Sequence, residues 1–372
     1  MSSSAQTGKP SLRVVAIGGG TGLSTLLRGL KRYVAAPAAA RRSTEAAPLL
    51  SPHLQPEPPP ADLPCIIRDL AAIVTVTDDG GSSGRLRDEL KMLPPGDIRN
   101  CMVALSEDEL LLARLFQYRF NQGGLEGHSF GNLFLAALSG ITGDFAQAVQ
   151  MSSQILAARG RIYPATNSNV TLSARMDDGS VVHGETSITA SPHRILELML
   201  SPADVEPLPA TLEAIANADL ITLGPGSLYT SLVTNLLVRG IPEALAASRA
   251  TRVFICNLMT QANESLGLTA SQHIEKILQH CGPNGANGAG AHSTGKHARI
   301  FDYALINTAP ISPTLLDLYA RGGQTPIVPD LDRIRALGIE PIPGDFALEG
   351  NLLRHDPDRL THALLALALA RP

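Results

Sequence analysis

Two adjacent carboxylates, Asp78 and Asp79, begin the polar segment Asp-Asp-Gly-Gly-Ser-Ser-Gly-Arg-Leu-Arg. Magnesium is usually held by one or two carboxylates together with phosphate oxygens and water, so both residues are candidate Mg²⁺ ligands and candidate catalytic residues. Neighbouring side chains on an extended backbone point in opposite directions, which leaves the second carboxylate free to cap the following turn. Asp-Gly is also a common turn pair, and both could be turn residues. We predict that at least one contacts a ligand or a metal ion.

Further polar side chains occur in the glycine-rich and proline-rich segments around residues 80–132. Arg87 could neutralise a diphosphate through forked hydrogen bonds or be a solvated surface charge, and Asn100 could likewise contact the ligand or be a solvated surface residue. His128, in Gly-His-Ser-Phe-Gly-Asn, could be a general acid, a hydrogen-bond donor to phosphate or a structural histidine. Asn132 could cap the helix that follows or reach the ligand. No motif identifies a nucleophile, so the catalytic residues are unknown.

A glycine-rich stretch near the N-terminus is the strongest candidate for holding phosphate. It follows four apolar residues, Val14 to Ile17, and precedes leucines spaced as on one face of a helix. Glycine lets the backbone approach a ligand closely, and a helix start presents unpaired N–H groups and partial positive charge. A tight strand–helix turn without a ligand is the alternative. The predicted ligand-binding residues of this stretch are Gly18, Gly19, Gly20, Thr21 and Gly22.

This stretch matches neither of two common nucleotide motifs. The dinucleotide fingerprint requires glycine at its first, third and sixth positions. The sixth position is Leu23 when counted from Gly18, and Thr25 when counted from Gly20. The phosphate loop of nucleotide triphosphatases requires Gly-Lys-Ser/Thr, and no lysine follows here. The sequence therefore predicts a nucleotide or phosphate site that is not a standard NAD or ATP site.

A second glycine turn, Gly-Pro-Gly-Ser, follows the predicted strand 219–223. It could be a second anion site in which the serine hydroxyl donates, or a plain helix start that the serine caps. Gly224, Gly226 and Ser227 are therefore further candidate ligand-binding residues.

The elements that must position these loops alternate between apolar strands and amphipathic helices. This alternation predicts one Rossmann-like, doubly wound α/β domain over residues 11–372 with a mostly parallel sheet. Ligands of such sheets collect beyond the carboxyl ends of the strands, so the polar loops should face one crevice. Residues 170–183 alternate apolar with polar residues around an Asp-Asp-Gly turn, which predicts an antiparallel hairpin. Residues 35–64 and 282–297 have low-complexity sequences and are predicted to be surface insertions.

Composition excludes several classes of protein. Hydrophobic residues make up 44% of the 372 residues and charged residues 17%, which is typical of a folded globular protein. The net charge of -4 gives no argument for nucleic acid as a partner. The polar N-terminus and the lack of a long apolar run predict no signal peptide and no membrane span, and scattered cysteines favour a reducing compartment. We therefore expect a cytoplasmic protein.

Taken together, these motifs resemble the YvcK branch of the YvcK/CofD-like family. The segments that carry the resemblance are Ala16–Ser24, Val74–Arg87, Leu93–Asn100, Phe116–Phe120, Gly127–Asn132, Ala218–Thr230 and Asn257–Gln261. Proteins of this branch are named gluconeogenesis factors. The resemblance implies a Rossmann-like domain that binds nucleotide sugars of the UDP type.

The resemblance also implies a regulatory role in cell shape or envelope synthesis during growth on gluconeogenic carbon sources. We expect such a regulator to act through a protein partner or through a conformational change. It further implies a cytoplasmic homodimer. The other branch of the family transfers a phospholactyl group to a deazaflavin precursor with Mg²⁺, and this reaction is the alternative function. That branch usually carries Asn-Thr-Gly-Asp-Asp in the loop where this chain has Val-Thr-Asp-Asp-Gly-Gly, which favours the regulatory branch.

Overall fold

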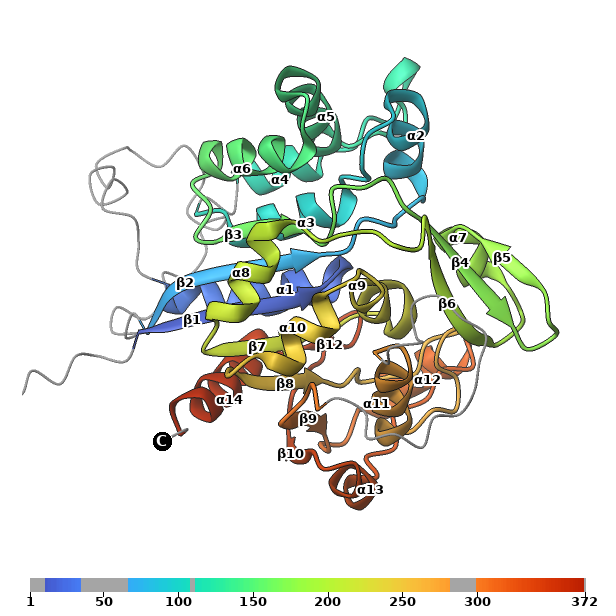
Figure 1. Ribbon diagram of the computed structural model, residues 1–372. Helices are drawn as coiled ribbons and strands as arrows, with labels where there is room; N and C mark the ends of the chain where they lie inside the picture. Colours follow the sequence, from blue (N-terminus) through green and yellow to red (C-terminus); the bar gives the residue numbers. More distant parts are fainter. Residues whose placement is uncertain (1–10, 35–65, 108–110, 282–298, 371–372) are drawn as a thin grey trace, which may run out of the picture.

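A seven-stranded, fully parallel sheet forms the centre of the protein (Figure 1). The computed structural model describes residues 11–34, 66–107, 111–281 and 299–370, so both predicted insertions lie outside the described residues. The strand order is β10-β9-β8-β7-β1-β2-β3, and every neighbouring pair is parallel. The strands of this sheet are β1 (Leu12–Gly18), β2 (Ile67–Val74), β3 (Arg161–Pro164), β7 (Leu220–Leu223), β8 (Thr251–Ile255), β9 (Tyr303–Asn307) and β10 (Glu340–Gly344).

Helices cover both faces of this sheet, which confirms the doubly wound α/β prediction. Helix α1 packs against α3 and α14, whereas α8 and α10 pack together and lie in front of the sheet in Figure 1. The helices are α1 (Gly20–Leu30), α2 (Gly81–Leu90), α3 (Gly96–Leu105), α4 (Leu111–Gln117), α5 (Phe130–Thr142), α6 (Phe145–Ile155), α7 (Glu185–Ala190), α8 (Pro209–Asn217), α9 (Thr234–Leu236), α10 (Ile241–Ala247), α11 (Ala270–Gln279), α12 (Pro313–Ala320), α13 (Leu331–Ala336) and α14 (Pro357–Leu369).

Two small antiparallel sheets accompany the central one. The predicted hairpin is confirmed: β4 (Thr171–Met176) pairs with β5 (Val181–His183), and β6 (Ile195–Ser201) adds a third strand beside β4. Near the C-terminus, β11 (Ala347–Leu348) pairs with β12 (Arg354–His355) just before α14 begins.

The first strand and helix form where the apolar spacing predicts them. The apolar residues of β1 are buried, and the four leucines on one face of α1 are fully buried in the main core cluster. Burying a leucine side chain stabilises a fold by about 1.5–3 kcal/mol, so this face holds α1 firmly against the sheet. The glycine stretch between β1 and α1 is therefore held at both ends. These leucines are Leu23, Leu26, Leu27 and Leu30.

Two helical segments differ from the sequence prediction. Helix α3 begins directly after Pro94-Pro95, where the sequence predicts no helix. Pro95 is the N-cap of this helix, and the carboxylate of Asp97 lies in its first turn, where negative charge is favourable. The helix predicted to start at Leu228 begins as a wide π-helical turn over Leu228–Val233.

Among the described residues, no helix combines the length and the apolar character that crossing a bilayer requires.

Candidate functional site

The main cavity lies where the direction of strand succession changes in the central sheet. Strand β1 lies between β2 and β7, and the loops that follow β1 and β7 leave the sheet side by side. Ligands of open parallel sheets bind at this type of switch point. The cavity holds about 500 Å³ and is lined by Gly19 to Gly22, Gly226 and Ser227 among others. The two glycine turns predicted from sequence therefore face one crevice.

The glycine loop after β1 is packed tightly against the turn after β7. A β-carbon on Gly22 would overlap the backbone carbonyl of Pro225, so only glycine fits at this contact. Gly20 adopts a φ of +61°, a conformation that other residues rarely accept. The N–H of Gly20 donates to the carboxylate of Asp97, which comes from the first turn of α3. One N–H at the start of α1 is thus already bound to a carboxylate of the chain.

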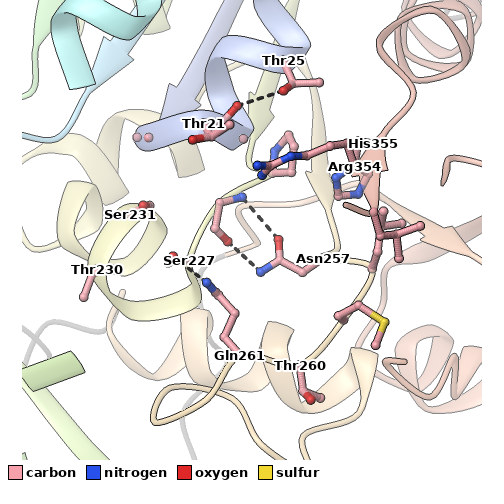
Figure 2. A pocket seen from close by; sticks show the side chains of 18 of the residues that line it. Thr21, Thr25, Ser227, Thr230, Ser231, Asn257, Thr260, Gln261, Arg354 and His355 are labelled. Atoms are coloured by element: carbon pink, nitrogen blue, oxygen red, sulfur yellow. Dashed lines mark hydrogen bonds between the residues drawn. The ribbon is translucent and has the colours of Figure 1, made fainter. Parts of the chain in front are cut away.

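Side chains from the loop after β8 hold the turn after β7. Asn257 accepts from the N–H of Gly226 at 3.3 Å and donates to its carbonyl at 2.8 Å, as Figure 2 shows. Gln261 donates to the hydroxyl of Ser227 at 3.0 Å. The side chain of Ser227 makes no capping hydrogen bond to the helix that follows, so the predicted serine cap is wrong.

The carboxylate of Glu264 takes the position at this second helix start that an external anion would occupy. Its two oxygens accept from the N–H of Tyr229 at 3.0 Å and from the hydroxyl of Thr230 at 2.8 Å. Burial raises the pKa of Glu264, while these hydrogen bonds oppose the rise. Helix N-termini favour negative charge, and here the chain supplies it internally.

Three further carboxylates, from Asp78, Asp97 and Glu185, line the cavity near the glycine loop. Burial raises the pKa of Asp97 to about 6, and the nearby charge of Asp78 adds to the rise. Burial also raises the pKa of Glu185 to about 9, reinforced by the charges of Asp97 and Asp78, although Thr77 donates to this carboxylate at 3.2 Å. A cation placed among these groups would stabilise their charged forms.

The two adjacent aspartates point in different directions, as the alternation of an extended backbone predicts. Asp78 lines the cavity and accepts from the N–H of Gly80 at 2.9 Å. Asp79 accepts from the backbone N–H of Thr186 at 2.8 Å and from its hydroxyl at 2.6 Å, so it caps the start of α7. Asp79 is not among the residues lining the cavity.

The other predicted ligand-binding side chains do not line this cavity. Arg87 is buried and donates to the carbonyl of Val170. Asn100 accepts from Arg99 at 2.9 Å. His128 and Asn132 lie on either side of the Ser82 hydroxyl, each at 3.1 Å from it.

The remaining observations on the predicted residues that do not line the cavity concern His128, Asn132 and two glycines. Burial lowers the pKa of His128, with nearby arginines adding to the effect. Ser129, rather than Asn132, caps α5. Gly18 is the last residue of β1, and Gly224 directly follows β7. Both glycines are buried, and neither lines the cavity.

Comparison with known proteins assigns the chain to a family. The family model described as 2-phospho-L-lactate transferase CofD matches residues 14–347. The chain belongs to the CofD family. It is 44% identical to a gluconeogenesis factor of Halalkalibacterium halodurans over 95% of both chains. It is also 41% identical to a gluconeogenesis factor of Bacillus subtilis, covering 96% of this chain and 98% of that one.

A solved structure extends this likeness to three dimensions. A crystal structure of a UPF0052 family member from Bacillus halodurans superposes with a TM-score of 0.81 at 44% identity, covering 96% of this chain and 99% of that one. The resemblance inferred from the motifs is thus confirmed for both family and fold.

In this member of the CofD family, several cavity residues have no motif that predicts a ligand role. Arg354 and His355 of β12 line the cavity, and Figure 2 places them on the side opposite Thr230 and Ser231. Leu258, Met259, Tyr319 and Leu353 give the same cavity an apolar part. These residues come from near the end of the chain or from the loop after β8, and only the course of the chain brings them to the glycine loops.

Proposed function

We propose that the protein binds a nucleotide sugar of the UDP type and acts as a regulator. The observation that supports this most is the cavity at the switch point between β1 and β7, with a glycine loop and a helix start at one part. The relatives named gluconeogenesis factors support a connection between such a regulator and gluconeogenesis. In this proposal the protein is a cytoplasmic homodimer. A protein partner in envelope synthesis or cell-shape control binds its ligand-bound form.

The distribution of polar groups in the cavity suits a ligand with a diphosphate and a ring. The glycine loop Gly19–Gly22 lines the cavity, and so do Leu258, Met259 and Leu353, which pack together in one hydrophobic cluster. Ligand pockets generally combine apolar walls with a few polar groups that fix orientation. A diphosphate fits the glycine part, and a ring with apolar faces fits the other.

A diphosphate would need a cation here because the described lining is rich in carboxylates. Arg354 is the only lysine or arginine among the described residues that line the cavity, against Asp78, Asp97 and Glu185. These three do not bring their oxygens within 4.8 Å of one another; among the described residues only Asp177, Asp178 and His193 make such a group. Magnesium held by Asp78 or its neighbours would therefore take its remaining ligands from phosphate and water, and it would neutralise charge on the diphosphate.

Calorimetry tests this function directly. UDP-sugars are titrated into the protein with and without Mg²⁺, and we expect saturable binding that weakens strongly when Mg²⁺ is absent. Asp78→Asn should reduce the Mg²⁺ dependence because it removes a cavity carboxylate. Asp79→Asn is the matched control, since its amide oxygen can still accept from Thr186, and it should bind as the wild type does. No heat of binding at millimolar UDP-sugar would end the proposal.

The second candidate function is a Mg²⁺-dependent transfer of a phosphoryl-linked group, as the name of the CofD family model suggests. The observation that favours it is the set of three carboxylates in one cavity, two of them with raised pKa values. Perturbed carboxyl groups in a cleft are typical of catalytic sites. If transfer occurs, Asp78→Asn should abolish product formation from a nucleotide-linked donor while binding remains measurable. Binding without any product in the wild type would reject this candidate.

A further inference from the structure

His355 occupies the apolar part of the cavity although it lies seventeen residues from the end of the chain. It is buried, as is Leu353, whereas Arg354 between them is exposed. Alternation along the chain from Leu353 into β12 therefore places His355 on the same side as Leu353, which lines the cavity and packs with Leu258 and Met259. The predicted site residues do not include it, and its role is open.

One hydrogen bond determines which nitrogen of the His355 ring carries the proton. Nε2 lies 3.0 Å from the backbone carbonyl oxygen of Cys256. A carbonyl can only accept, so Nε2 is the protonated nitrogen and donates this bond. Burial lowers the pKa of His355 to about 4, which keeps the ring neutral at pH 7. Nδ1 is then an acceptor with a lone pair.

Nδ1 has no protein partner in the described part of the chain. No hydrogen bond from a described residue reaches it, and it is not one of the side-chain atoms that are sealed from solvent without a partner. His355 lines the cavity, and an acceptor that is open to solvent and lacks a protein partner can take a hydrogen bond from a bound molecule. Asn257 and Gln261, by contrast, already hold the turn after β7.

We propose that Nδ1 of His355 accepts a hydrogen bond from a donor on the ring-bearing end of the ligand and makes this part of the cavity selective for such donors. The inference rests on the proposed nucleotide-sugar function. Two groups of a UDP-type ligand supply this chemistry: the imide N–H of the uracil ring and a ribose hydroxyl. An acceptor in the same place, such as the ring nitrogen of cytosine, would face the lone pair of Nδ1 and be disfavoured.

The test compares UDP, CDP and 2′-deoxy-UDP by calorimetry in the presence of Mg²⁺, with the wild type and two variants. His355→Gln removes the ring acceptor but offers an amide N–H to the carbonyl of Cys256. His355→Asn places an amide oxygen near the position of Nδ1 but loses the bond to Cys256. His362→Gln is the control, because His362 is exposed on α14 and does not line the cavity. Thermal melting checks that each variant is folded.

We expect His355→Gln to weaken UDP binding about tenfold, as the loss of one hydrogen bond implies, and His355→Asn to weaken it less. If the donor is the imide, wild type prefers UDP over CDP at least tenfold and His355→Gln loses that preference. If the donor is the hydroxyl, wild type binds UDP and CDP alike but 2′-deoxy-UDP more weakly, and His355→Gln removes that difference.

Two results overturn the inference. If the folded His355→Gln and His355→Asn variants bind all three ligands with wild-type affinity, Nδ1 makes no hydrogen bond to the ligand. That result would leave the proposed function intact. Failure of the wild type to bind any of the three would end the proposed function and this inference with it.

Discussion

The surroundings of each acidic residue in and beside the cavity determine its pKa and its role. Asp78, Asp97 and Glu185 line one cavity, and burial with mutual charge raises the pKa of two of them. Asp79, one residue from Asp78, caps α7 instead. With a pKa of about 9, the carboxyl of Glu185 holds a proton at pH 7, and a bound cation would favour the release of that proton.

The raised pKa of Glu185 predicts how the stability of the protein depends on pH. Its folded pKa is about 9 against an ordinary value of 4.5, so the folded state holds a proton that the unfolded state has lost between these values. The free energy of unfolding therefore falls as the pH rises through this window. Glu185→Gln does not titrate, so its melting temperature should exceed that of the wild type at pH 8 and match it near pH 5.

Differential scanning fluorimetry at the two pH values, without divalent cations, measures this difference. Glu213→Gln is the matched control, since Glu213 is exposed on α8. A melting temperature of Glu185→Gln that falls below the wild type at pH 8 would contradict the assignment of a buried, protonated Glu185.

At the scale of elements, the site depends on the contact between two turns. The loop after β1 and the turn after β7 touch at Gly22 and Pro225, and Asn257 fixes the second turn from the next strand. Two parallel strands bring these turns together because their carboxyl ends meet at the same edge of the sheet.

Gly22→Ala should disturb this contact. The added methyl group would overlap the carbonyl of Pro225, and backbone atoms cannot move aside as a flexible side chain can. We expect a loss of about 1–3 kcal/mol in the free energy of unfolding, measured by urea denaturation, together with weaker UDP binding. Gly124→Ala is the control, because a β-carbon there meets nothing within 4 Å. Equal stability of the two variants would mean that the contact is not tight.

At the scale of the whole molecule, the cavity is lined by residues from widely separated parts of the sequence. Its lining runs from Gly19, just after the first strand, to His355, just before the last helix. A ligand bound there contacts elements that are separated by most of the sequence, so it should stabilise the fold as a unit rather than one segment.

Ligand binding should therefore raise the melting temperature in a single transition. At one hundred times the dissociation constant, UDP with Mg²⁺ should add about 2.7 kcal/mol to the free energy of unfolding. Scanning calorimetry measures the shift, and uridine without a diphosphate serves as the control ligand with a smaller effect. A melting curve that does not move at a UDP concentration saturating by titration would contradict binding in this cavity.

Much of the fold follows from local patterns, and the exceptions have physical causes. The apolar spacing of β1 and α1 and the turn of the β4–β5 hairpin predict those elements. Helix α3 is not predicted because its N-cap, Pro95, has no side chain that could cap the helix, so the usual sequence signal of a helix start is missing. Strand β10 contains two prolines and lies at the edge of the sheet, where missing N–H groups are tolerated.

The amino-acid pattern alone specifies the glycine loops, the parallel strands that carry them and the family to which the chain belongs, because each depends on residues close together in sequence. It does not specify which side chains share the cavity. Only the tertiary structure turns Asp78 inward and Asp79 toward α7, and only it brings His355 to the carbonyl of Cys256. Side-chain direction and long-range proximity depend on how the sheet orders its strands and on which loops pack against one another, and no local spacing of residues encodes that order.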